Sequence, residues 1–348
     1  MEQGFQSRGG IIDTGQSREL LTMEWMFEHG ASAVWRDLCA PFFDVSQIQS
    51  DRMRATMGAH VWRIGPLVFW RSTCGGQILR RTLNHLSEFG EHVLVTRYVS
   101  GRTIGSTDLV PFQVRAGEVA VRNLERPFSA LQYPSVVESM LIPRRFIAAE
   151  TSEGLALRVF NRNDLIHKSL LGLFQEVFRT LRMSTGGVPS ALVDRVFAVV
   201  REAAAQPHHS SNLRRASRDS QLRAMQAYIE QNLGRLDLSA DEMLPNFGVS
   251  RATLYRMFEV FGGVRNYIVD RRLFHALIDI SAEGAYRGKI QRAAKQWGFS
   301  SAANFNRSVQ SVFGCPPGAL FKFETETTDP SQSDSLNHQS QARELLIG

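Results

Sequence analysis

Two stretches of this chain carry the same pattern: NFGVSRATLYRMFEVFGG at residues 246–263 and QWGFSSAANFNRSVQSVFG at residues 296–314. In each, a glycine is followed by a serine, an amphipathic segment and a second glycine. Gly248 and Gly298 lie 50 residues apart, and the closing glycines lie 51 apart. Glycine gives the backbone freedom that a tight turn needs, and serine can cap the free N–H groups of a following helix. The pattern predicts two short helices, each entered through a glycine turn.

A second short amphipathic segment precedes each stretch, LDLSADEML at residues 236–244 and KIQRAAKQW at residues 289–297. Each copy is therefore expected to be a helix, a tight turn and a second helix, which is the plan of a helix-turn-helix unit. Ser250 in the first copy, and Ser300 or Ser301 in the second, can cap the second helix. Two copies at matched spacing distinguish this pattern from an ordinary helical hairpin.

Eighteen residues, VRNYIVDRRLFHALIDIS (264–281), join the two copies and have the spacing of an amphipathic helix. At about 1.5 Å per residue such a helix spans roughly 27 Å. One turn of a DNA duplex is somewhat longer, roughly 34 Å. A rigid helix of this length can present two short helices to successive major grooves on one face of DNA.

The positive charge of the chain is concentrated in the same region. Residues 214–323 contain 16 Lys and Arg against 9 Asp and Glu, whereas residues 1–213 contain 23 against 20 and residues 324–348 contain 1 against 5. The whole chain has a formal charge of +6, and residues 214–323 alone have +7. A basic block indicates a polyanionic partner, although a solvated basic surface on an ordinary domain gives the same count.

Residues 220–322 resemble the DNA-binding domain of the AraC/XylS family of bacterial transcription regulators in the order and spacing of their motifs. The motifs are LSADEM, GVS, a leucine, MF and a glycine in the first copy, YI, RL and an alanine in the connecting helix, and GF, F, R and FGCPP in the second copy. The chain departs from the family pattern at five positions: Leu244, Pro245, Asp279, Ala293 and Val309. Pro245 removes a backbone donor inside the first scaffold helix and favours a kink there.

The resemblance implies that the outward face of the second helix in each copy contacts DNA. Arginine can bridge O6 and N7 of guanine, and asparagine can bridge N6 and N7 of adenine. Arg256 and Arg307 hold matching places in the two copies, so they are the leading candidates. The implied DNA-binding residues are Arg251, Ala252, Thr253, Tyr255 and Arg256 in the first copy and Ala302, Ala303, Asn304, Asn306 and Arg307 in the second. A solvated or phosphate-only role is the alternative for each.

The N-terminal half changes character along its length. Residues 17–50 have mixed helical spacing and are expected to be mostly helical. From residue 52 to about residue 145, short runs rich in β-branched and aromatic residues alternate with glycine-rich or polar turns, which predicts a sandwich or small barrel. The resemblance implies a regulatory domain at 1–205 that contains a small cupin-like β-barrel (about 52–150) and flanking helices. With the all-α C-terminal domain, the fold class is multidomain α+β.

Two segments, at about 164–182 and 190–205, each show two adjacent apolar seams at helical spacing. Two seams make an apolar stripe wider than one neighbour needs. One seam can therefore pack on the β-domain while the other contacts a partner subunit, which is the role that the resemblance implies. The residues assigned to dimerisation are Ile166, Leu170, Leu173, Phe174, Val177 and Leu181. The alternative is that both seams belong to the core of one chain.

The resemblance also implies that the barrel senses a small molecule or makes the dimer contact. The candidate ligand contacts are Trp62, Trp70, Arg80, Tyr98 and Phe112. Core packing explains the apolar ones equally well. The histidines of this region lack the His-x-His spacing of metal-dependent cupins, and no glycine-rich phosphate loop or Gly-x-Ser-x-Gly motif is present. The sequence therefore predicts a protein that is not an enzyme and uses no metal or cofactor.

Residues 206–219 are polar and basic without a period and are expected to be a linker that leads into the DNA-binding domain at 220–323. Residues 324–348 are rich in Thr, Ser, Asp and Gln and are expected to be disordered. The three cysteines match no metal or redox spacing, which predicts buried thiols in a reducing compartment. Neither a signal peptide nor a long apolar stretch is found, which predicts a cytoplasmic protein without membrane contact.

These features favour a dimeric, effector-responsive regulator that binds double-stranded promoter or operator DNA and contacts RNA polymerase if it is an activator. Two alternatives stay open. The protein could bind DNA constitutively, with an N-terminal domain that only dimerises. It could also be an interaction protein that has lost DNA binding, as Pro245, Ala302 and Ala303 would suggest. Effector-dependent binding separates the first two hypotheses, and the absence of salt-sensitive duplex binding would identify the third.

Overall fold

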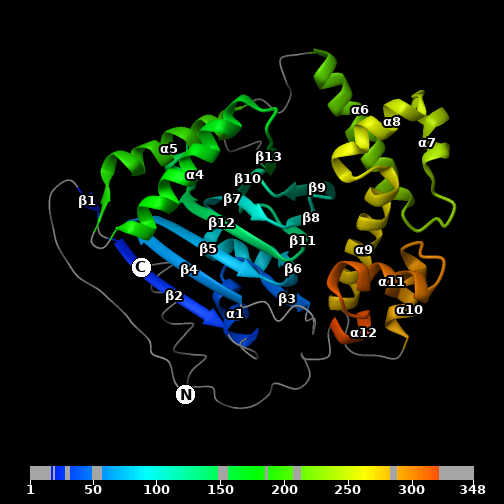
Figure 1. Cartoon of the computed structure of the whole chain (residues 1–348), viewed down its shortest axis with the longest axis horizontal. Coiled ribbons are helices and arrows are strands. Elements are labelled where there is room, and N and C mark those ends of the chain that lie inside the picture. Colours follow the sequence, from blue (N-terminus) through cyan, green and yellow to red (C-terminus); the bar gives the residue numbers. More distant parts are fainter. Residues whose placement is uncertain are drawn as a thin grey trace.

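The structure, a computed structural model, describes residues 17–18, 20–27, 32–48, 57–147, 156–184, 187–206, 213–282 and 288–320. These residues form a β-rich N-terminal half and a helical C-terminal half that lie against each other (Figure 1). Among the described helices, none combines the length and the apolar character that are needed to cross a membrane.

The larger sheet of the N-terminal half has seven antiparallel strands in the order β13-β10-β7-β12-β5-β4-β2. Their bounds are β2 Leu20–Phe27, β4 Met57–Ile64, β5 Leu67–Cys74, β7 His92–Ser100, β10 Val119–Asn123, β12 Ser135–Pro143 and β13 Leu157–Phe160. Most of these segments are rich in β-branched and aromatic residues, which pack well on a pleated surface.

The smaller sheet has five antiparallel strands in the order β3-β6-β11-β8-β9. Their bounds are β3 Asp44–Ile48, β6 Gly76–Arg81, β8 Arg102–Thr107, β9 Val110–Arg115 and β11 Phe128–Gln132. A short ladder also pairs β1 (Ser17–Arg18) with β14 (Val188–Pro189). The two main sheets share a core in which Val61 and Leu94 of the larger sheet pack with Leu79 of the smaller one. This barrel-like pair of sheets confirms the predicted β-domain.

The expectation that residues 17–50 are mostly helical is wrong. In this segment the described residues form the strands β1, β2 and β3 and the helix α1 (Ser32–Cys39). β2 pairs with β4 along its whole length, with Leu20 opposite Ile64. The periodicity of so short an apolar segment is ambiguous. Pairing with β4, about 40 residues away, satisfies the backbone hydrogen-bonding groups of β2, and this segment is therefore a strand and not a helix.

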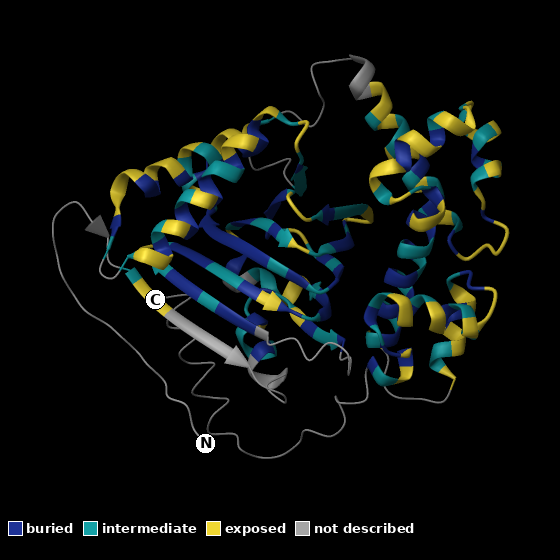
Figure 2. Ribbon diagram, viewed as in Figure 1, coloured by how far each residue is buried: buried dark blue, intermediate teal, exposed yellow. Residues whose placement is uncertain are grey.

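Two helices, α4 (Leu165–Met183) and α5 (Ser190–Ala205), cover one face of the seven-stranded sheet (Figure 1 and Figure 2). Phe178 of α4 meets Trp62 of β4 edge to face, with ring centroids 5.8 Å apart. The six residues assigned to dimerisation are all buried in this core: Ile166, Leu170, Leu173, Phe174, Val177 and Leu181. They are not accessible to a partner subunit, because the sheet and α5 cover the side of α4 that carries them.

The C-terminal half has the predicted order of elements. Its bounds are α6 Leu213–Asn232, α7 Ala240–Phe247, α8 Arg251–Phe258, the 3-10 turn η3 Glu259–Phe261, α9 Val264–Ala282, α10 Lys289–Gln296, α11 Ala302–Phe313 and α12 Pro317–Leu320. The helix α7 continues through Pro245, so the proline does not end the first scaffold helix. The predicted linker is too long, because residues 213–219 already belong to α6. The tail at 324–348 lies outside the described residues.

The connecting helix α9 packs on the five-stranded sheet as well as within its own half (Figure 1). Leu273 and Leu277 of α9 share one apolar core with Ile78, Ile104 and Leu131 of the strands β6, β8 and β11. This contact is apolar and continuous, so the two halves are not independent units joined by a linker.

Charged side chains strengthen the same contact. Arg102 of β8 donates to both carboxylate oxygens of Asp270 in α9, at 2.5 and 3.0 Å. Arg271, which is 1% exposed, donates to the backbone oxygen of Gly105 in β8 at 2.7 Å and to Glu230 in α6 at 2.5 Å. A buried charge is tolerated only when it is paired and hydrogen-bonded. These bonds therefore fix α9 on the sheet in one register.

Candidate nucleic-acid interface

The second helix-turn-helix unit, α10 and α11, is entered through a turn that requires glycine. Gly298 has a φ of +71°, and a Cβ there would lie 2.3 Å from the backbone oxygen of Leu233. Ser301 caps α11, since its hydroxyl accepts a hydrogen bond from the backbone N–H of Asn304 at 3.1 Å. The helix ends at Gly314, with a φ of +75°. Both ends of α11 are thus fixed by residues of the repeated pattern.

The first unit, α7 and α8, repeats this construction with a more open turn. Gly248 has a φ of +60°, but a Cβ at this position would meet nothing within 4 Å. The hydroxyl of Ser250 accepts a hydrogen bond from the backbone N–H of Thr253 at 3.2 Å. Leu254 and Phe258 are buried and hold α8 on its core. A glycine turn with positive φ and a serine cap therefore build both units.

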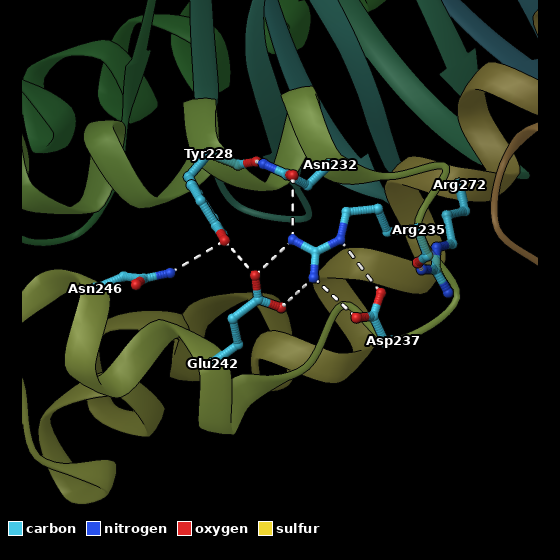
Figure 3. A network of polar contacts seen from close by, with 7 residues as sticks. All are labelled: Tyr228, Asn232, Arg235, Asp237, Glu242, Asn246 and Arg272. Atoms are coloured by element: carbon cyan, nitrogen blue, oxygen red, sulfur yellow. Dashed lines mark hydrogen bonds and ion pairs between the residues drawn. The ribbon is translucent and has the colours of Figure 1, made fainter.

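A polar network ties the first unit to α6 (Figure 3). Arg235 lies between two carboxylates and donates to Asp237 at 2.9 Å and to Glu242 at 2.6 Å. The hydroxyl of Tyr228 in α6 donates to Glu242, and Asn246 of α7 donates to that hydroxyl at 3.1 Å. The bonds from Tyr228 and Arg235 lower the pKa of the Glu242 carboxyl, which keeps it charged at neutral pH. The network fixes the platform that carries α8.

The outward face of α11 carries the side chains that the sequence assigns to DNA. All five are at least partly exposed: Ala302, Ala303, Asn304, Asn306 and Arg307. Arg307 donates to the side-chain oxygen of Asn304, and Asn304 donates to the hydroxyl of Ser300. These hydrogen bonds hold an arginine and an asparagine next to each other on an open helix face.

The outward face of α8 is similar in exposure and different in charge. All five assigned residues are at least partly exposed: Arg251, Ala252, Thr253, Tyr255 and Arg256. Arg251 forms an ion pair with Asp241 at 2.5 Å, in which both side chains are mostly exposed. Within the described residues, the guanidinium of Arg256 takes part in no ion pair. Arg256 is therefore open to an anion, whereas Arg251 would first have to release Asp241.

One residue at this surface escaped the sequence analysis. Arg218 of α6 is exposed and donates to the backbone oxygen of Arg256 at 3.3 Å, which places a further guanidinium beside α8. Residue 218 lies in the predicted linker, outside both copies of the repeat. In the sequence, only the basic composition of residues 206–219 could have indicated this residue.

A second candidate site is a cavity of about 130 Å³ in the β-domain. Trp70 and Tyr98, two of the predicted ligand contacts, line it. Phe112 lies next to it, with its ring centroid 4.5 Å from the guanidinium carbon of Arg122, which does line the cavity. Within the residues that the structure describes, no cluster of His, Cys, Asp or Glu is placed to hold a metal ion.

Trp62 and Arg80 do not line the cavity, which corrects two predicted ligand contacts. Trp62 packs against Phe178 of α4 on the other face of the larger sheet. Arg80 follows Leu79 on β6, and because side chains alternate along a strand it points to the opposite face. The sequence indicates which segments are strands, but it does not say which face of each strand is turned inward.

Comparison with known proteins gives one family match. Residues 245–322 match the model of a family described as a helix-turn-helix domain. No curated protein matches the chain. Among solved structures, the AraC-like transcriptional activator CuxR is similar over 78% of this chain and 100% of that chain, with 23% identity and a TM-score of 0.48. ToxT from Vibrio cholerae O395 is similar over 74% of this chain and 98% of that chain, with 15% identity and a TM-score of 0.30.

Proposed function

We propose that this chain, whose C-terminal half is a helix-turn-helix domain of the AraC type, is a sequence-specific transcription regulator that reads duplex DNA with α8 and α11. One observation carries the proposal. Two helices of equivalent construction, each capped by a serine and each with an exposed arginine at the same place, are joined by the 19-residue helix α9. Such a helix spans about 28 Å, which suits adjacent turns of one DNA face.

The chemistry of the two faces differs, so the two helices read different bases. α11 offers an arginine and two asparagines, which suit guanine and adenine edges in the major groove. α8 offers Arg256 and the partly exposed ring of Tyr255, which can contact a thymine methyl group. Arg218 and Arg251 are placed to bind phosphate oxygens beside α8, which positions the protein without reading sequence.

The regulator acts as a homodimer in the cytoplasm, where it binds promoter or operator DNA and responds to a small molecule in the cavity of the β-domain. As an activator it would also contact RNA polymerase. The dimer contact uses residues other than the six buried ones of α4, because those face the core of their own chain.

The test is selection of bound duplexes from a random DNA pool by the full-length protein at about physiological salt. The expected product is a bipartite motif whose halves lie about 10–10.5 base pairs apart, one half for each helix. A well-folded protein that selects no motif would contradict DNA reading and would favour the interaction-protein hypothesis. If the affinity of the protein for the selected motif does not change with any small molecule tested, the hypothesis of a constitutive DNA binder is favoured.

A further inference from the structure

The two helix-turn-helix units differ in charge. Residues 240–263, which contain the first unit, have two Arg against three Asp and Glu. Residues 288–320, which contain the second unit and α12, have two Lys and two Arg and no acidic residue. Carboxylates of the first unit can balance its arginines, as Asp241 does for Arg251 at 2.5 Å. The second unit has no carboxylate of its own for this purpose.

Most of the positive charge of the second unit faces solvent. The exposed cations are Arg292, Lys295 and Arg307. The fourth cation, Lys289, is half-buried and donates to the backbone oxygen of Ile280 at 3.2 Å. Exposed charges of one sign raise the local electrostatic potential and attract an anionic partner.

One carboxylate from outside the second unit contacts it. Asp279 of α9 accepts a hydrogen bond from the indole N–H of Trp297 at 2.7 Å and another from the side-chain amide of Gln296 at 3.2 Å. Both donors are neutral side chains. These bonds hold the end of α10 on α9 and involve none of the exposed cations.

The chain that follows the second unit has the opposite charge. Residues 324–334, ETETTDPSQSD, contain four Asp and Glu and no Lys or Arg. They belong to the tail that lies outside the described residues. Four negative charges therefore follow the four positive charges of the second unit, with Lys322 between them. The acidic residues are Glu324, Glu326, Asp329 and Asp334.

The last described residue places the start of this tail at the second unit. Leu320, the final residue of α12, is 1% exposed and shares an apolar core with Phe305 and Val309 of α11. The 12 residues of α11 span about 18 Å. Asp329 follows Leu320 by nine residues, and nine extended residues span at most roughly 30 Å. The acidic segment is therefore long enough to reach any position along α11.

We propose that the acidic segment 324–334 binds to the exposed cations of the second unit, Arg307 among them, and competes with DNA for α11. Carboxylates form charge-assisted hydrogen bonds with guanidinium groups. Each exposed ion pair contributes little, but attachment to the same chain gives the segment an effective concentration in about the millimolar range. The proposal rests on the proposed function, since it takes α11 to contact DNA. Its consequence is that the tail lowers the affinity of the protein for DNA.

The contact is tested first without DNA, in the full-length protein, by the rate at which phenylglyoxal modifies each arginine, followed by mass spectrometry. The tail variant combines Glu324→Gln, Glu326→Gln, Asp329→Asn and Asp334→Asn. At low salt, Arg307 should react about threefold faster in the tail variant than in the wild type. In about 1 M salt, which screens exposed ion pairs, the two rates should be equal. Arg256, at the matching place in the first unit, should react equally in both proteins.

A control variant separates docking from net charge. It neutralises four exposed acidic residues of the N-terminal half, with the substitutions Glu91→Gln, Asp108→Asn, Asp194→Asn and Glu202→Gln. It changes the net charge as the tail variant does, but Arg307 should react as in the wild type. Equal Arg307 rates in the wild type and the tail variant at low salt would overturn the proposal. Equal acceleration in the tail and control variants would also overturn it, as would protection that depends on protein concentration, which assigns the tail to a second copy.

DNA affinity tests the competition. At low salt the tail variant should bind the selected duplex about threefold more tightly than the control variant does, since no docked segment has to be displaced. Protection of Arg307 without this gain in affinity would refute the competition. A protein that selects a DNA motif but shows no protection of Arg307 refutes the tail contact alone. Protection in a protein that selects no motif supports the contact and refutes the proposed function.

Discussion

Arg256 and Arg307 occupy equivalent positions in the two helix-turn-helix units, yet their surroundings differ. Arg307 bonds to Asn304, which orients its guanidinium before DNA arrives. Arg256 has only the neighbouring Arg218, which bonds to its backbone oxygen and adds positive charge. Preorganisation reduces the entropy that binding costs. We therefore expect Arg307 to contribute more to sequence discrimination. The contribution of Arg256 to DNA affinity should depend more strongly on salt concentration.

Replacing either arginine by alanine should weaken binding to the selected duplex by about 1–3 kcal/mol and relax specificity at one base position. The measurement is titration of a labelled duplex and of single-base variants with Arg256→Ala and Arg307→Ala. Arg195→Ala, which removes an exposed arginine of α5 that pairs with Glu176, is the control and should bind like the wild type. If both test variants bind the selected duplex normally, α8 and α11 do not read DNA.

At the scale of the element, the two units use the same kind of glycine turn, but only the first turn has room for a side chain. Both turn glycines have positive φ, but only Gly298 lies close to other backbone. A Cβ added at Gly298 would lie 2.3 Å from the backbone oxygen of Leu233. Leu233 is the residue that follows α6, so the second unit is built directly onto the end of that helix. The turn of the first unit at Gly248 faces open space.

Gly298→Ala should therefore lower the free energy of unfolding by about 2–4 kcal/mol, because strain from a left-handed alanine adds to a steric clash. Gly248→Ala, the matched variant in the other copy, carries only the backbone penalty of about 1–2 kcal/mol. Denaturant unfolding of the two full-length variants measures the difference. A Gly248→Ala protein that is as unstable as Gly298→Ala would contradict the close approach of α6 to the second turn.

For the molecule as a whole, the packing of α9 on the five-stranded sheet is the contact that joins the two halves. Tyr133, directly after β11, stacks on Phe313 of α11 with ring centroids 5.6 Å apart, and its hydroxyl donates to Asp270 at 3.1 Å. The helix-turn-helix half is thereby attached to the five-stranded sheet, which also lines the cavity.

Asp270→Ala should loosen this contact, because Arg102 and the hydroxyl of Tyr133 both lose their acceptor. We expect a loss of about 1–3 kcal/mol in the free energy of unfolding and faster hydrogen exchange in α9 and β8. Asp237→Ala is the control, since its carboxylate is 76% exposed and pairs with Arg235 within the C-terminal half. Unchanged exchange in Asp270→Ala would mean that the apolar contact alone holds the halves together.

The sequence by itself determined the C-terminal architecture. Glycines, serine caps and apolar residues at i and i+4 act within a few residues of one another, so a repeated local pattern is sufficient to place α7, α8, α10 and α11 and the helix between them. The alternating runs between residues 52 and 145 likewise indicated a β-domain.

Only the tertiary structure decided which partners those elements found. β2 is a strand because β4 pairs with it, and the double seam of α4 is core because a wide sheet and α5 cover it. Arg122 faces the cavity because of the face that β10 presents after the two sheets close. Such contacts join residues far apart in sequence, so no short pattern records them.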